Sequence, residues 1–302
     1  MKHILRENAF ESWSMAIEYC DEILRGKATF KYKKNFISSL HNAVELFVKQ
    51  RMLDKNDPRI VKKNDLKKIN SELEKEYVNS NNLNEFFLNL SSDDRKQVYS
   101  ISYSNLINCS DELFEEYYEK SGDRKTKETV NDSMRLLKDL RNAETHFYID
   151  KDDFLTEKEF EQLHNFMIVF YEVLQYYKMF PFIGKPFRQY SKLSFRHNKL
   201  ENFSYENAVK QSKFVNELKE NIEGKIFQCS SDSSYEISQD ITFRLNDKYD
   251  DSNFESLWTY VEMMLTYDLL KWEEEFEENE FEDEEGNIIS TCDKFRSYSI
   301  NS

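Results

Sequence analysis

Glycine and proline are scarce in this chain, and their scarcity limits the folds open to it. The 302 residues include only 5 Gly and 3 Pro. Sandwiches, barrels and Rossmann sheets need many turns, which these two residue types usually make, whereas long helices need few. The 24 Phe and 18 Tyr can supply much of a buried core. The sequence therefore predicts a mainly α protein, with room for two domains or one large one.

Two amphipathic helices are predicted near the N-terminus, over residues 7–27 and 36–53. Their apolar positions step by three and four residues, which places them on one face of a helix. In the first helix these positions are Phe10, Trp13, Ile17, Cys20 and Leu24. In the second they are Ile37, Leu40, Val44 and Phe47, and Arg51 continues the same spacing. Gly26 should end the first helix. Because the connection is short, we expect the two helices to pack antiparallel in a bundle.

The rest of the chain divides near Pro181. We expect a helical bundle over residues 1–180 and a small α+β region over residues 181–302, with a basic and aromatic stretch, short strands, a helix and an acidic run. Local patterns predict helices between residues 84 and 120, from about Thr129 to Phe147 and from about Phe254 to Trp272. They also predict a loop over residues 121–128, a capping box at Thr156–Glu159, and a strand over residues 235–245, where apolar residues alternate.

The net charge of −15 is concentrated near the C-terminus. Ten of the thirteen residues in Glu273–Glu285 are acidic, whereas residues 1–150 carry 25 Lys and Arg against 26 Asp and Glu. This distribution does not exclude an RNA site elsewhere. Such a run is typically a solvated tail. Alternatively it competes with RNA for a basic groove, or the residues after it close the fold as a strand.

The sequence lacks the usual signs of membrane insertion or secretion. No apolar run approaches the ~20 residues of a membrane span, and the first residues contain no apolar signal region. The four Cys are far apart and form no CxxC pair. We therefore expect a cytoplasmic protein with free thiols, no membrane contact, no metal site and no cofactor.

The stretch LRNAETHFY at residues 140–148 crowds hydrogen-bonding groups onto a predicted helix. At 100° per residue, Leu136 and Leu140 belong to the core stripe, while Arg141, Asn142 and His146 lie away from it. Arg offers a fork of donors that fits phosphate oxygens, Asn can hold a phosphate or a sugar hydroxyl, and His can exchange a proton near neutral pH. The alternative is an ordinary polar helix face.

Two motifs resemble the HEPN superfamily, a helical-bundle family rich in RNA-cleaving toxins and abortive-infection proteins. One is Arg141-Asn142-x3-His146, and the other is the second helix, which matches at Ala43, Glu45, Leu46, Lys49 and Leu53. The resemblance covers roughly residues 7–180. It implies a homodimer in which Arg141 and Asn142 hold the scissile phosphate. It also implies that His146 is general base or acid for attack by the RNA 2′-OH, which leaves a 2′,3′-cyclic phosphate. Tyr148 extends the resemblance to toxins whose antitoxin nucleotidylates a Tyr, unless it is an interfacial aromatic.

Several other polar residues remain open. His41, Glu45 and Lys49 form either a second polar row in the same groove or a solvated helix face. His164 is expected at the surface, off the apolar stripe of its helix. Arg196–His197 falls in the basic and aromatic stretch, which could bind single strands by stacking, although packing is the commoner role of such aromatics.

Three classes of function fit these patterns. The first is a metal-independent endoribonuclease that acts in phage defence or as a regulated toxin, with RNA as substrate, a homodimeric state and an antitoxin or regulatory partner. The second is a non-catalytic HEPN-like module that binds RNA, a nucleotide or a protein. The third is a helical scaffold without an active site. The resemblance favours the first class, because decayed members of the family commonly lose the Arg or the His.

Overall fold

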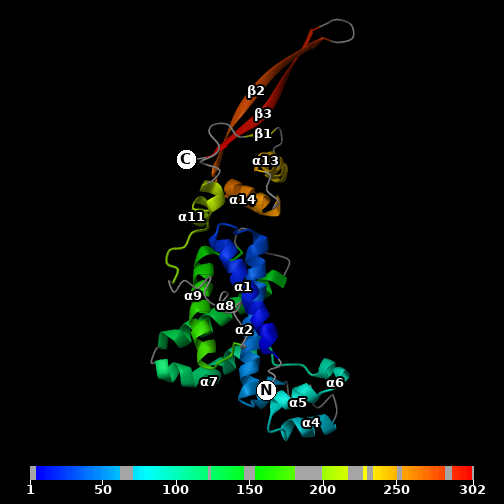
Figure 1. Ribbon diagram of the computed structural model, residues 1–302, viewed down its shortest axis with the longest axis vertical. Coiled ribbons are helices and arrows are strands. Elements are labelled where there is room, and N and C mark those ends of the chain that lie inside the picture. Colours follow the sequence, from blue (N-terminus) through cyan, green and yellow to red (C-terminus); the bar gives the residue numbers. More distant parts are fainter. Residues whose placement is uncertain are drawn as a thin grey trace. The chain divides into compact units, whose positions relative to one another are not determined.

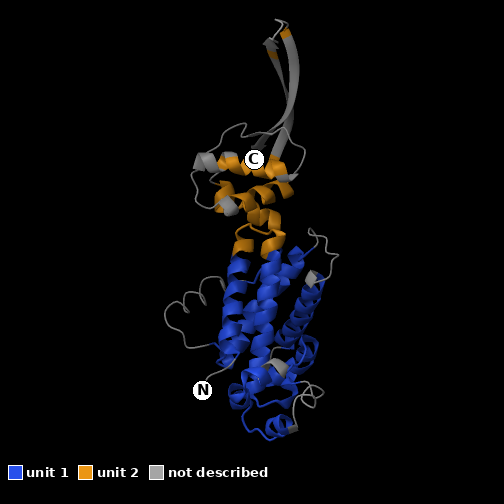
Figure 2. Ribbon diagram, turned by 90° about the vertical axis from the view of Figure 1, so that its right-hand side faces the viewer, with its two compact units in different colours: residues 1–21, 33–203 blue, residues 22–32, 204–302 orange. Residues whose placement is uncertain are grey.

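The structure is a computed structural model, and it describes residues 5–61, 71–121, 124–145, 154–180, 199–216, 227–229, 234–249, 254–282 and 288–300. Most of these residues are helical, which confirms the mainly α class. The chain forms two compact units (Figure 2). The first holds Met1–Asp21 with Lys33–Phe203, and the second holds Glu22–Tyr32 with Ser204–Ser302. The predicted boundary at Pro181 lies outside the described residues.

The elements carry the labels of Figure 1. The described helices are α1 (Arg6–Leu24), α2 (Phe30–Asp54), the short 3-10 helix η1 (Pro58–Ile60), α4 (Ser71–Val78), α5 (Leu83–Asn89), α6 (Ser92–Gln97), α7 (Tyr103–Ser121), α8 (Arg124–Thr145), α9 (Glu157–Tyr176), α11 (Tyr205–Lys210), α13 (Ser234–Tyr249) and α14 (Phe254–Thr266). The described strands are β1 (Phe227–Cys229), β2 (Leu270–Glu282) and β3 (Ile288–Ile300).

The first unit is built on α1, α2, α7, α8 and α9, whose apolar faces meet in one core. Asn42 near the middle of α2 donates to Ser12 Oγ at 2.6 Å, whereas Gln50 near its end accepts from the backbone N–H of Leu5 at 3.0 Å. Later residues of α2 therefore meet earlier residues of α1, so the two helices are antiparallel, as predicted. Trp13 is 1% exposed and packs against the rings of Phe47 and Phe170 at 6.3 and 6.2 Å. Burying one such side chain contributes about 1.5–3 kcal/mol.

Two local predictions in the first unit have different outcomes. The capping box is confirmed, because the Thr156 N–H donates to Glu159 Oε2 at 2.8 Å and the Glu159 N–H donates to Thr156 Oγ1 at 3.4 Å. The predicted loop over residues 121–128 is wrong in its second half, since α8 already begins at Arg124. An ion pair between Arg124 and Glu128, four residues apart with N–O 3.0 Å, supports this first turn.

The small helix α5 attaches to the C-terminal end of α2 through polar groups. Gln50 is fully buried, and its amide donates to Asp54 Oδ1 at 2.8 Å and to Asn84 Oδ1 at 3.0 Å. The Asn84 amide in turn donates to Asp54 Oδ1 at 3.3 Å. Because buried polar groups are costly without partners, this network fixes where α5 meets α2.

Gly26 ends α1 in the second unit, as predicted. Its φ of +98° is a conformation that side chains with a Cβ rarely adopt. The N–H of Gly26 donates to Ile23 O at 3.0 Å and that of Lys27 donates to Glu22 O at 2.9 Å, which satisfies two of the last helical carbonyls. A Cβ at Gly26 would lie 2.9 Å from Val209 Cα, so the backbone of α11 passes too close for any other residue.

Residues 235–245 are helical, so the predicted strand is wrong. They belong to α13, whose buried positions Ile237, Ile241 and Leu245 are four residues apart. Phe243, which completed the apparent alternation, is 51% exposed. The apolar residues are thus compatible with both periods, and packing of α13 against α14 selects the helix.

Most of the acidic run is a strand rather than an irregular tail, because Glu273–Glu282 belongs to β2. This strand pairs antiparallel with β3 from Leu270↔Ile300 to Glu282↔Ile288, and the sheet order is β1-β3-β2. The helix predicted to reach Trp272 ends at Thr266 instead. The central strand β3 contains β-branched residues such as Ile289 and Thr291, while the charged β2 occupies an edge of the sheet, where charge discourages further strand pairing.

Candidate functional site

Helix α8 carries the first two residues of the predicted site. Its buried side chains recur at helical spacing and are Val130, Ser133, Met134, Leu137 and Leu140. Leu140 lies on the core stripe as predicted. Leu136 is only half-buried, however, and Leu137 takes the core position assigned to it. Because residues 136 and 137 are both Leu, hydropathy alone does not determine which of the two faces the core.

Arg141 and Asn142 follow directly on this stripe. Arg141 is one turn beyond Leu137 and half-buried, so it lies at the margin of the core, whereas Asn142 is exposed. The guanidinium and the amide are therefore carried by neighbouring positions where the helix turns from the core to its exposed side. His146 and Tyr148 lie outside the described residues, and the described part of α8 ends at Thr145.

The pairing of α7 with α8 indicates which part of the bundle lies level with Arg141. Asn131 accepts from Ser110 Oγ at 2.9 Å and donates to Asp111 Oδ1 at 2.7 Å. Only residues 122 and 123 separate the two helices, so they run antiparallel. From Asn131, about three helical turns lead to Arg141, and from Ser110 about two turns lead back to Tyr103. Arg141 thus lies within about one turn of the level of the first residues of α7.

A row of polar side chains on α2 meets the same end of α7. The His41 ring stacks on Tyr103 with centroids 4.0 Å apart and planes at 26°, and its Nδ1 lies 3.9 Å from Glu45 Oε2. Lys49 forms an ion pair with Glu45 and donates to Ser100 Oγ at 2.7 Å. Lys49 is only 8% exposed. The alternative of a solvated helix face is therefore wrong.

Tyr103 closes this row from the α7 side. Its burial, with a smaller effect of Glu45, holds the pKa of the phenol well above its usual value, so the hydroxyl stays protonated near neutral pH. Among the described residues no group forms a hydrogen bond with this hydroxyl. The stacked face of Tyr103 instead fixes the plane of the His41 imidazole, which orients its two nitrogens.

His164 is buried, so the prediction of a surface position is wrong. It is 3% exposed on α9, between the buried residues Leu163 and Phe166. Burial lowers the pKa of its imidazole, although a hydrogen bond with Asn165 acts in the opposite direction. His164 is therefore a neutral core residue at pH 7 and does not belong to the polar groups around Arg141.

The opposite end of the α7–α8 hairpin is acidic. A groove of about 530 Å³ there is lined by Asp111, Glu112, Glu115, Tyr118, Glu119, Arg124 and Lys127. Lys127 pairs with Asp111 at 3.0 Å, and four carboxylates face two cations in all. A polyanion would be repelled from this end of the hairpin.

Ser100 and Tyr103 lie in no recognisable motif, so the sequence does not predict them as neighbours of the His41–Lys49 row. Ser100 lies just before α7 and Tyr103 is its first residue, and both reach α2 through tertiary packing. Arg196–His197 lies outside the described residues. Within the described ranges, no three or more His, Cys, Asp or Glu side chains gather so that they could hold a metal ion. The thiols of Cys20 and Cys109 are free, as predicted, and buried.

Among the described helices, none combines the length and the apolar composition that a membrane span requires. In comparisons with known proteins, no family model, no curated protein and no solved structure matches this chain.

Proposed function

We propose that this chain is a metal-independent endoribonuclease of the HEPN type that acts in phage defence or as a regulated toxin. The observation that carries the proposal is the position of Arg141 and Asn142 at the margin of the core, on neighbouring positions of a bundle helix. A guanidinium and an amide displayed together can hold a phosphodiester, because they offer several donors to its oxygens.

The reaction uses the nucleophile that RNA itself supplies. Arg141 and Asn142 would hold the scissile phosphate and stabilise the negative charge that develops on its oxygens. His146 would take the proton from the 2′-OH as general base, or give one to the leaving 5′-oxygen as general acid. Attack of the 2′-oxygen forms the new P–O bond and breaks the P–O5′ bond. The products are a 2′,3′-cyclic phosphate and a 5′-hydroxyl.

The His41–Glu45–Lys49 row would serve as a second layer behind the site. It approaches the end of α7 that lies level with Arg141, and its members pair with one another and with Ser100. Such a network can orient the groups that contact substrate. Its residues would therefore act through Arg141 and His146 rather than on the RNA.

A homodimer would complete the site. One helix carries one Arg141 and one Asn142, whereas a twofold axis beside α8 would bring two sets together across a cleft. RNA would then contact both protomers. In a toxin role, a small antitoxin or other regulatory partner would cover this cleft or modify Tyr148.

Incubation of purified protein with total RNA in EDTA tests the proposal. We expect cleavage that leaves cyclic phosphate ends and spares DNA. His146→Ala should lower the rate by at least ~10²-fold, the usual effect of losing a general acid or base. Arg141→Ala should lower it by about 10²–10³-fold, the usual effect of losing a donor to the developing charge.

Arg135→Ala is the matched control. Arg135 lies on the same helix, has a side chain that is 64% exposed, and pairs only at the surface with Asp132. Its loss should leave cleavage unchanged, which separates the role of Arg141 from a general loss of positive charge. If His146→Ala cleaves RNA as fast as the parent, the catalytic assignment is wrong. RNA binding without cleavage would instead support the non-catalytic module.

A further inference from the structure

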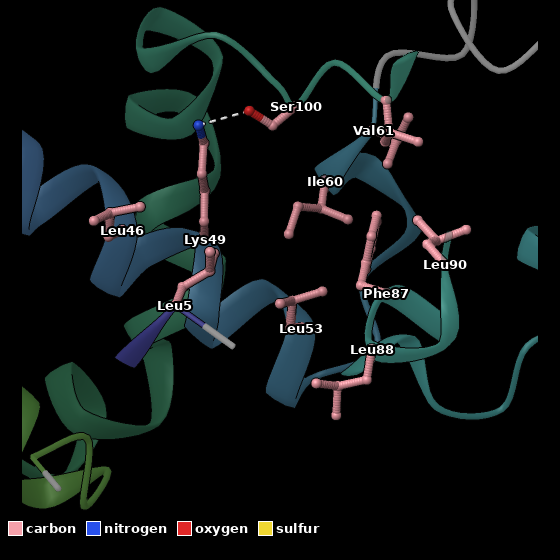
Figure 3. Close-up of a pocket in the computed structure, with 11 residues that line it drawn as sticks. Leu5, Leu46, Lys49, Leu53, Ile60, Val61, Phe87, Leu88, Leu90 and Ser100 are labelled. Carbon is pink, nitrogen blue, oxygen red and sulfur yellow. Dashed lines mark hydrogen bonds between the residues drawn. The ribbon is translucent and has the colours of Figure 1, made fainter. Parts of the chain in front are cut away.

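A largely apolar cavity of about 310 Å³ lies beside α2 in the first unit, and it shares only Lys49 with the residues proposed for cleavage. Its walls come from α2, η1, α5 and the segment that leads into α7 (Figure 3). It is lined by Leu5, Leu46, Lys49, Leu53, Ile60, Val61, Phe87, Leu88, Leu90, Val98 and Ser100. The volume falls in the range of small-molecule sites, which are mostly apolar with a few placed polar groups.

The two polar lining residues stand together on one side. Figure 3 shows the hydrogen bond from Lys49 to Ser100, with apolar side chains such as Ile60 and Phe87 facing it across the cavity. Lys49 is 8% exposed, so its ammonium group is held by the fold rather than by solvent. The site is therefore amphipathic, with one polar corner and an apolar body.

The charge of the polar corner selects the head group of a ligand. Glu45 already neutralises Lys49, and a second carboxylate beside Glu45 would be repelled. Lys49 has three N–H donors, of which Glu45 and Ser100 take two. The Ser100 hydroxyl accepts from Lys49 and retains its own proton as a donor. The corner thus offers two donors and no net charge, which suits an uncharged acceptor such as a hydroxyl or carbonyl oxygen.

The volume sets the size of the body. At roughly 30 Å³ per small heavy-atom group, about ten non-hydrogen atoms fill the cavity. Apolar walls that face empty space lose dispersion contacts, so a packed chain gains by filling such a space. The ligand needs no ring and no charged group to match the rest of the cavity, because the remaining walls are aliphatic side chains and Phe87.

We propose that this cavity binds an uncharged amphipathic small molecule, with one hydroxyl or carbonyl group on an apolar body of about nine carbons. The polar group accepts from Lys49 and Ser100, and the body packs among the aliphatic walls. The site rests on neither Arg141 nor His146, so its occupancy and RNA cleavage can be tested separately.

Calorimetric titration of the full chain with 1-nonanol tests the proposal, and nonanoate serves as the charged counterpart. We expect one equivalent of 1-nonanol to bind with a negative heat-capacity change, which marks burial of apolar surface. Nonanoate should bind at least about fivefold more weakly. Equal or tighter binding of nonanoate would overturn the head-group assignment, and no saturable binding of 1-nonanol would overturn the site.

Two pairs of variants locate the binding. Val98→Trp and Leu88→Trp place an indole at half-exposed lining positions and should abolish binding, whereas Val78→Trp, at a position 70% exposed and outside the cavity, should not. Ser100→Ala removes one neutral donor and should weaken binding by about threefold to tenfold. Thermal melts identify variants that fail to fold. Binding by a folded Val98→Trp or Leu88→Trp chain that matches the parent would show adsorption elsewhere and overturn the proposal.

Discussion

Gly26→Ala should loosen the second unit without affecting the first. An Ala at φ +98° costs about 1–2 kcal/mol, because its Cβ approaches its own backbone. That Cβ would also lie 2.9 Å from Val209 Cα and 3.1 Å from Ala208 O, closer than the ~3.5–4.0 Å of normal carbon contacts. Both neighbours are backbone atoms, so relief requires α11 to shift, and crowding of this kind costs about 1–3 kcal/mol. Ala also lowers the conformational entropy of the unfolded chain, which offsets this loss of stability by about 0.5–1 kcal/mol. We therefore expect a net loss of roughly 1–4.5 kcal/mol, with a middle value near 3 kcal/mol.

Hydrogen exchange followed by mass spectrometry measures this loss in each unit separately. Since 1.4 kcal/mol is a factor of ten, the slow amides of α14 should exchange roughly 5- to 1600-fold faster in the variant, with a middle value near 100-fold. Those of α9, in the first unit, should not change. Lys178→Gly gives the matched control, because Lys178 is an exposed non-glycine residue at φ +53° just after α9. Relief of its strain should stabilise the first unit by about 1 kcal/mol. If α14 exchange in Gly26→Ala stays within threefold of the parent, the close approach of α11 does not constrain this position.

Three further predictions concern protonation, the strands and assembly. Burial lowers the pKa of His164 below its usual 6.5, so the unfolded chain binds the proton more tightly, and stability should be complete above pH 6.5 and fall as the pH drops below it. Melting temperatures at pH 7.5 and 5.5 should differ less in His164→Gln, and an unchanged difference would contradict this assignment. Deleting residues 273–302 removes β3, the partner of β1, and should lower the melting temperature of the second unit; an unchanged melt would mean that the strands contribute no stability. If the acidic strand also repels RNA, the deletion should tighten RNA binding at low salt more than at high salt, where charges are screened. Light scattering should give a dimer, and a stable monomer that still cleaves RNA would count against the shared cleft.

Local signals in the sequence predicted the helices of the first unit well. The step of three and four residues in the first helix marked Trp13 and Cys20, which are buried. Thr156 and Glu159 marked the start of α9 by chemistry that depends on four adjacent residues only. In both cases the physical cause of the structure lies within a few residues of the pattern, so no tertiary contact is needed to recognise it.

Sequence patterns gave wrong predictions where the local residues fit two kinds of structure and tertiary packing selects one of them. Ile237, Ile241 and Leu245 satisfy a strand as well as a helix, and only the contact with α14 decides. The charged residues of β2 have weak strand propensity, and β3 supplies the hydrogen-bonding partner that organises them. His164 looked like a surface residue because a polar side chain off the main stripe usually is one.

The candidate site shows the same division. The motif at Arg141 and Asn142 could be recognised from neighbouring letters. The partners of the His41–Lys49 row could not, since Ser100 and Tyr103 come from a distant segment. The sequence left open whether Lys49 belonged to a polar row or to a solvated face, and its burial beside the cavity depends on residues far along the chain.

The second unit is built from two segments that are far apart in the chain, so during translation it can assemble only after its later segment has been synthesised. Residues 22–32 leave the ribosome early, but the Arg25 carbonyl accepts a hydrogen bond from the Tyr260 hydroxyl, 235 residues later in the chain. At about 5–20 residues per second, that partner is synthesised roughly 10–50 s afterwards. Until then Gly26 and its neighbours have no α11 or α14 to pack against. A nascent chain can therefore form the first bundle while the C-terminal end of α1 remains unpacked. Ribosome-bound chains stalled before α14 should therefore be cut by protease near residues 22–32, whereas finished chains should resist cleavage there.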